Sequence, residues 1–198
     1  MENSGIKQLL VELESELDRT HAPILHRLNQ GRTENELRDI FGGMQILDDV
    51  YALYMWKDGT DTTNAALGKC WLFKMGALIP AQKAVQYYKK FVNRDEYWID
   101  GMFPLFESLG GDFYLIDINS TSPTYGFIFF YYPGAVDFEV IISKYDSLET
   151  LVRTILECFR RGAYFYDKNA LTLEFTPELE REITKNNNPR SAYWTLFT

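Results

Sequence analysis

The sequence predicts an α+β fold: a single domain in which helices from both ends of the chain pack on a central, mainly antiparallel β-sheet. Apolar residues recur at helical spacing over residues 5–29, and aromatic and β-branched residues dominate three short runs between 113 and 142. A second strongly amphipathic stretch follows at 148–159. Helices on both sides of an unbroken group of strands favour helices packed on one sheet, and 198 residues suit one domain.

The first third of the chain predicts short helices. The apolar spacing over 5–29 predicts a helix. Pro23 either breaks this helix or lies in the first turn of a second one. Thr33 and Glu36 have the spacing of a capping box for a helix that Gly42 and Gly43 end.

The next stretch predicts alternating elements. Asp48 is expected to cap a helix reaching Trp56, and Asp58-Gly59 has the composition of a turn. Residues 70–75 are expected to form a short strand, and Pro80 suits the first turn of a helix that continues to residue 91.

Three runs in the middle predict an antiparallel meander: residues 113–118, 126–132 and 139–142, joined by short links. Residues 127–132 are almost all aromatic and are apolar on both faces of the expected strand. The favoured interpretation is a central strand covered on both sides, and the alternative is an exposed aromatic patch of the type found in protein interfaces.

The last third predicts two helices. Asp146 and Glu149 have the spacing of a capping box for a helix with a regular apolar stripe, which Gly162 ends. Thr176-Pro177 begins a last helix that the Asn-rich run 186–189 ends.

Charge is concentrated in one segment. Residues 95–150 contain ten acids, a single base, Lys144, and 14 of the 31 aromatic residues, so this segment carries −9 and the rest of the chain +1. We expect these acids to be displayed on a rigid aromatic platform, where a negative field attracts cationic partners. Direct nucleic-acid binding is not expected, because it needs clustered Lys and Arg, although a mimic of nucleic acid stays open.

A basic stretch precedes the acidic segment. No acid occurs between residues 62 and 94, and two interpretations of the cations there stay open: the solvated face of a helix, or internal pairing with the acidic sheet. The cations are Lys69, Lys74, Lys83, Lys89, Lys90 and Arg94.

The residues that most often bind metals or act as nucleophiles are few. Cys70 and Cys158 lack CxxC spacing, so buried free thiols are expected. His21 and His26 would lie about 140° apart on a helix, which favours surface histidines over a zinc pair.

The Gly110-Gly111-Asp112 run is expected to be a turn and lacks the context of a phosphate loop. Asp112 and Asp117 would point to opposite faces of a strand, so no metal site is expected there. No catalytic residue, cofactor or metal is therefore expected, and the chain is predicted to be a non-enzyme. A glycosidase-like pair of carboxylates stays open, since acids are abundant.

The order of these pieces resembles the SUKH superfamily of SMI/KNR-like domains. A helix ends in Tyr54-Met55-Trp56-Lys57-Asp58-Gly59, and Phe103-Pro104-Leu105-Phe106 is similar to the family's apolar strand with a proline. The run from Gly110 to Asp117 resembles the family's Gly-Asp-aromatic-x-x-x-Asp pattern. Gly126 then opens an apolar strand, and Ser147-Leu148-Glu149 opens a long helix.

The likeness covers residues 33–162, which leaves 1–32 as an N-terminal helical segment packed on the domain and 163–198 as a C-terminal extension with a last helix. It departs from the family at Asp48, where a proline is usual, and over residues 64–98. The resemblance implies a protein-binding domain, in bacteria often an immunity protein that neutralises a toxin such as a nuclease, and in fungi a regulator of cell-wall synthesis.

The leading hypothesis is thus a cytoplasmic immunity protein that occludes a basic toxin domain. No apolar run is long enough to span a bilayer, and Met1–Gly5 opens no signal peptide, so no membrane contact is expected. The alternatives are a small cell-wall hydrolase and a regulatory scaffold. The expected partner-binding residues are Trp98, Asp100, Tyr125, Tyr131, Tyr132, Asp137 and Glu139.

Overall fold

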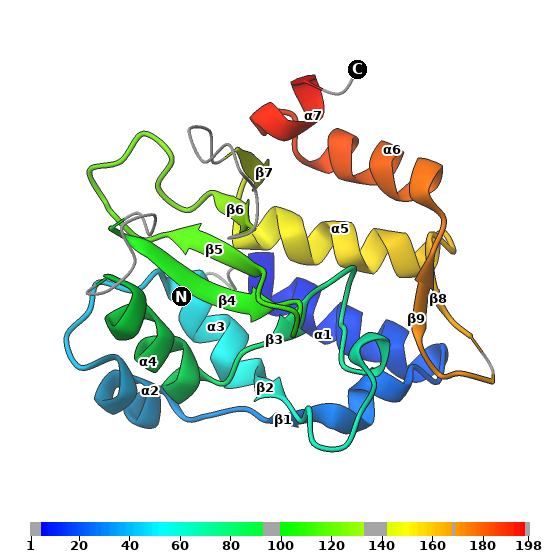
Figure 1. Ribbon diagram of the computed structural model, residues 1–198, viewed down its shortest axis with the longest axis horizontal. Helices are drawn as coiled ribbons and strands as arrows, with labels where there is room; N and C mark the ends of the chain where they lie inside the picture. Colours follow the sequence, from blue (N-terminus) through cyan, green and yellow to red (C-terminus); the bar gives the residue numbers. More distant parts are fainter. Residues whose placement is uncertain (1–4, 93–99, 133–141, 168, 197–198) are drawn as a thin grey trace.

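The computed structural model describes residues 5–92, 100–132, 142–167 and 169–196. The chain folds as a single α+β domain, as predicted (Figure 1). A five-stranded sheet lies at its centre, with helices from both ends of the chain packed around it. No helix in the described ranges is long and apolar enough to cross a membrane.

The central sheet is an antiparallel meander, and two of the three predicted runs, 113–118 and 126–132, form neighbouring strands in it, whereas residues 139–141 of the third run lie outside the described residues. Its strands are β3 (Ala77–Leu78), β4 (Met102–Glu107), β5 (Phe113–Asp117), β6 (Ile128–Tyr131) and β7 (Ser143–Tyr145), adjacent in that order. Strand β6 is flanked by β5 and β7, and Ile128, Phe129 and Tyr131 are all buried. The prediction of a covered central strand is confirmed in place of an exposed aromatic patch.

The helices pack around this sheet from both ends of the chain. Helix α1 lies along α5 and also contacts α3, α4 packs on β4 with α2 beside it, and α6 and α7 pack on α5 and β7 respectively (Figure 1). Their bounds are α1 Gly5–Arg19, the 3₁₀ helix η1 Pro23–Arg27, α2 Glu34–Phe41, α3 Asp48–Trp56, α4 Ala81–Val92, α5 Leu148–Arg160, α6 Pro177–Asn187 and α7 Ala192–Leu196.

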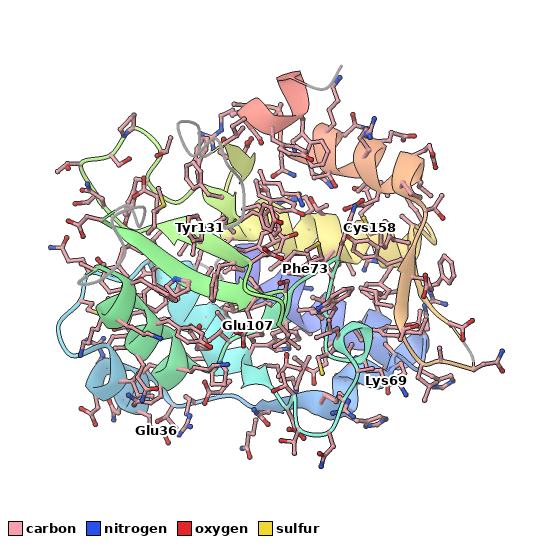
Figure 2. The ribbon with its side chains drawn as sticks, viewed as in Figure 1. Glu36, Lys69, Phe73, Glu107, Tyr131 and Cys158 are labelled. Carbon is pink, nitrogen blue, oxygen red and sulfur yellow. The ribbon has the colours of Figure 1, made fainter. Side chains whose placement is uncertain are left out.

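Neighbouring residues of β5 show how both faces of the sheet are filled. The Phe113 ring meets Tyr87 and Phe91 of α4 at centroid distances of 5.5 and 5.6 Å. The Tyr114 ring lies 4.8 Å from Phe73 and 4.9 Å from Phe130. Successive side chains of a strand point to opposite faces, so helix α4 covers one face, and an aromatic cluster that includes Phe73, labelled in Figure 2, fills the other.

Most local helix signals are confirmed. Thr33 and Glu36 form the predicted capping box at α2, and Gly42 ends it with φ 55°. At α5 the prediction is off by one residue, because Ser147 with Thr150 forms the capping box and Asp146 instead binds the backbone N–H of Arg190. Asp48 is likewise the first residue of α3 and not its cap.

Several short elements depart from the predictions. Residues 70–75 form no strand, since Phe73 makes only an isolated bridge to Gly76 across a tight turn. Two small antiparallel pairs were not predicted, because three or four residues with mixed polarity carry almost no periodic signal. They are β1 (Leu28–Gln30) with β2 (Lys57–Thr60), and β8 (Tyr164–Tyr166) with β9 (Leu173–Phe175). The short 3₁₀ helix η2 (Leu67–Lys69) lies beside β9.

The predicted turn at Asp58-Gly59 is in fact strand β2. The buried Asp58 carboxylate accepts a 2.6 Å hydrogen bond from Arg32 Nε and a 2.8 Å bond from the Ala81 N–H at the start of α4. Gly59 has φ 86°, and a Cβ there would lie 2.5 Å from Pro80 Cγ. Glycine is thus required both by backbone conformation and by the close approach of Pro80.

A matched pair of substitutions separates these two requirements. Gly43 also has φ 86° but would place a Cβ in open space. We expect Gly43→Ala to lower the free energy of unfolding by about 1 kcal/mol through backbone strain, and Gly59→Ala by about 2 kcal/mol more through the clash with Pro80. Urea unfolding of both variants measures the difference, and equal losses would contradict the steric role of Pro80.

Lys144, the only base of the acidic segment, is buried in an aromatic cage. Its Nζ donates to Tyr114 Oη at 3.1 Å and lies 5.1, 5.2 and 5.8 Å from the ring centroids of Tyr114, Phe130 and Tyr193. Burial lowers the pKa of Lys144 to about 8, partly offset by the negative charge of Glu180. The rings therefore stabilise an ammonium group that has lost most of its hydration.

Lys144 should make stability depend on pH. Its pKa is about 8 in the folded chain, against an ordinary value of 10.5, so between these values the unfolded chain holds more protons and stability rises with pH. We expect the free energy of unfolding of the wild type to rise by about 2 kcal/mol relative to Lys144→Met between pH 7.5 and 9.5. Tyrosine ionisation affects both proteins equally, so it cancels in the comparison with the Met variant. Parallel curves of unfolding free energy against pH would contradict a lowered pKa of Lys144 in the folded chain.

Candidate protein-binding surface

The strand register divides the predicted partner-binding residues between two ends of the sheet. Met102 pairs with Asp117, and the Asp117 N–H donates to Phe127 O at 3.0 Å, so Asp100 and Tyr125 lie towards the same end. Phe113 pairs with Tyr131, so Tyr132 lies at the opposite end. Five residues of extended chain separate Tyr132 from Phe127, roughly 17 Å, so the two exposed tyrosines do not form one patch.

Exposure further reduces the predicted set. Tyr125 and Tyr132 are 44% and 54% exposed, and Asp100 is exposed. Tyr131 is 3% exposed, so the prediction that its ring anchors a partner is wrong: it lies on β6 between two other strands (Figure 2). Trp98, Asp137 and Glu139 lie outside the described residues.

The expected display of acids on the sheet is wrong for most of the described ones. Glu107, Asp112, Asp117 and Asp146 are all less than 9% exposed. Each accepts at least one hydrogen bond from this chain, as from Lys83 Nζ to Glu107 at 2.7 Å and from Ser108 Oγ to Asp112 at 2.8 Å. These carboxylates therefore stabilise the fold through internal hydrogen bonds and ion pairs, and they contribute little to the charge of the surface.

One of these buried acids holds the loop that carries Tyr125. Asp117 accepts hydrogen bonds from the Asn119 N–H at 2.9 Å and from Thr124 Oγ1 at 2.8 Å, and its backbone oxygen accepts from the Gly126 N–H. Three bonds to a residue that is 1% exposed fix both ends of the loop. Tyr125 is thus presented on a well-anchored support, which limits the entropy lost on binding.

A small open recess of about 300 Å³ lies at this end of the sheet. Tyr88 Oη donates to Asp100 Oδ1 at 3.4 Å inside it. Burial, and then the charge of Asp100, raise the pKa of Tyr88, so its hydroxyl stays protonated and able to donate. The recess is lined by Met44, Gln45, Tyr88, Asp100, Gly101, Ile118 and Asn119.

Three carboxylates gather near the same loop, and we name Asp48, Asp49 and Glu149 the acidic corner. Burial raises the pKa of Asp49, and the negative charges of Glu149 and Asp48 raise it further. Glu149 forms an ion pair with Arg153 at 2.5 Å, whereas neither Asp48 nor Asp49 has an ion pair within the described part of the chain. A Cβ on Gly126 would lie 3.4 Å from Leu47 Cδ2, so the loop of Tyr125 adjoins the start of α3.

The acidic corner was not predicted as a site. Acids in the first turn of a helix stabilise the helix dipole, so Asp48 and Glu149 were assigned to capping. Their grouping depends on the contact of α3 with α5, which brings together residues 100 or more positions apart. The three acids are visible in the sequence, but no local pattern predicts that α3 and α5 begin side by side.

The basic stretch adopts both of its open interpretations. Lys83 pairs with Glu107 of the sheet, and Lys74 lies 3.5 Å from the buried Glu180. Lys89 and Lys90 are exposed near the end of α4, and Lys69 is half-buried. Pairing with the acidic sheet is therefore confirmed for Lys83, Lys74 pairs with α6 instead, and Lys89 and Lys90 lie on an exposed part of α4. Arg94 lies outside the described residues.

The remaining candidates give no catalytic grouping. Cys70 and Cys158 are buried free thiols, as predicted, and burial raises the pKa of each. His21 and His26 are both exposed. Within residues 5–92, 100–132, 142–167 and 169–196, no group of three His, Cys, Asp or Glu side chains could hold a metal ion.

No protein-family model matches this chain, and no curated protein shows significant similarity to it.

Proposed function

We propose that this protein is a non-enzymatic protein-binding module of the immunity type, which occludes a basic partner such as a toxin domain. The observation that carries the proposal is the acidic corner, where burial, and then repulsion from Glu149 and Asp48, raise the pKa of Asp49. Carboxylates held together without enough cations of their own gain free energy when a partner supplies Arg or Lys.

Tyr125 supplies the second element of such a surface. It is 44% exposed, it is held by the buried Asp117, and its loop adjoins the acidic corner through Leu47 and Gly126. Tyrosine is enriched among residues that dominate binding energy, and surrounding charges mainly raise association rates. The order of motifs that resembles SMI/KNR-like domains supports the same class of function.

A carboxylate-dependent hydrolase is the second candidate, favoured by the raised pKa of Asp49 beside the charge of Glu149. One protonated and one ionised carboxyl is the pairing that glycosidases use. In the described residues, however, the recess at this end of the sheet is lined by Asp100 and by neither acid of that pair. Release of reducing sugar from cell-wall material that Asp49→Asn abolishes would favour the hydrolase.

The binding proposal predicts a charge-dependent capture. Beads carrying the wild type should retain one basic protein from lysate of the source organism, and about 0.5 M salt should release most of it, since surface charges are screened. The double substitution Asp48→Lys with Asp49→Lys should reduce the captured amount at least about tenfold, because it places like charges in the interface. Quantitative mass spectrometry of the eluates measures both effects.

Asp18→Lys is the control for a charge reversal elsewhere on the surface. Asp18 is exposed near the far end of α1, whose first residue Gly5 lies beside Glu149, so it is about 20 Å from the acidic corner. It should leave capture unchanged. The purified wild type should then inhibit the captured protein while the double variant does not. A partner captured equally by all three baits, or one whose activity is unaffected, would contradict the proposal.

A further inference from the structure

Two pockets adjoin beside the β8–β9 hairpin, at the opposite end of α1 from the acidic corner. The larger is about 460 Å³ and lies between the end of α1, the start of η1 and the hairpin. A pocket of this volume is in the range that holds small organic ligands. Its walls are mainly apolar and include Pro23, Phe159, Tyr164, Phe165, Tyr166 and Leu171.

Two apolar side chains stand exposed at the rim of this pocket. Phe165 is 48% and Leu171 44% exposed. Leu171 has φ 55°, an uncommon conformation for a leucine, and its N–H donates to Asp167 O at 2.8 Å. The Asp167 carboxylate is engaged by the N–H groups of Asn169 and Ala170. The loop therefore holds a large apolar side chain at the pocket mouth at a cost in backbone strain.

The second pocket, of about 400 Å³, shares Pro23 and Leu171 with the first. Its lining also includes His26, Arg27, Lys69 and Asp61. Lys69 lies on the segment beside the hairpin (Figure 2) and has no ion pair within the described ranges. The Arg27 guanidinium donates a hydrogen bond to the backbone oxygen of Asp61 at 3.2 Å and has no ion pair among the residues that the structure describes. In a chain of net charge −8, this pocket gathers cations next to an apolar cavity.

We propose that the paired pockets bind a small carboxylate carried on an apolar group, with the apolar part against Phe159 and Phe165 and the carboxylate between Arg27 and Lys69. One negative charge suits this site better than the two of a phosphate monoester, because Asp61 offsets one of the cations. The site is separate from the proposed partner-binding surface, so either can fail without the other.

Calorimetric titration with four probes tests this assignment: decanoate, 2-naphthoate, decan-1-ol and acetate. At least one of the two apolar carboxylates should bind about tenfold or more tightly than decanol, since the alcohol lacks the charge, and acetate should show no saturable binding. Lys69→Glu should weaken the carboxylate at least about tenfold and leave decanol unchanged. Phe165→Ser should weaken both decanol and the carboxylate, because it removes apolar wall.

Lys7→Glu is the charge-matched control, at the other end of α1, and should leave every affinity unchanged. Lys69→Gln replaces Lys69→Glu should that variant not fold, and circular dichroism checks each protein. The proposal is overturned when neither carboxylate saturates below about 1 mM, or when Lys69→Glu and Lys7→Glu weaken binding equally.

Discussion

The buried Asp58 carboxylate is the constraint on which the arrangement of the segment from β1 to α4 depends. It joins Arg32, which precedes α2, to the first N–H of α4, and its own strand pairs with β1. An uncompensated buried carboxylate costs several kcal/mol, so strand β2 is stable here only when both partners are in place. Helix α4 in turn covers the sheet through Tyr87, Phe91 and Lys83, which reach Phe113 and Glu107. The position of α4 on the sheet is therefore fixed at its first residue by the hydrogen bond to the Asp58 carboxylate.

The same residue shows why sequence reasoning succeeds for some elements and fails for others. Some signals involve only residues that are close in sequence, and each of these was predictable: the capping box of Thr33 and Glu36, the helix end at Gly42 and the apolar stripe of α5. Asp58-Gly59 has the composition of a turn but forms part of a strand that pairs with β1. The donors to the Asp58 carboxylate, Arg32 and Ala81, are 26 and 23 residues away in the sequence. A local pattern cannot reveal a hydrogen-bond acceptor whose donors come from elsewhere in the chain.

The predicted position of the surface charge also failed because burial depends on contacts between distant parts of the chain. The count for residues 95–150 is correct, yet Glu107, Asp112, Asp117 and Asp146 are buried, and each accepts at least one hydrogen bond from this chain. Asp48 and Asp49, which have no ion pair in the part of the chain that the structure describes, belong instead to a segment with no unusual composition. Part of the candidate surface, Asp100 and Tyr125, was predictable from composition, whereas the acidic corner needed the contact between α3 and α5. Charge patterning along a chain thus describes a surface only after burial is known.

The two free thiols have a practical consequence. Both sulfur atoms belong to residues that are 0% exposed, and burial raises the pKa of each, so neither is available as thiolate in the closed structure. Cys70 follows η2 on the long segment between β2 and β3, while Cys158 lies within α5 at the centre of the fold. The alkylation rate of each cysteine should therefore report a separate opening reaction, and the two rates together measure how far the periphery loosens before the core does.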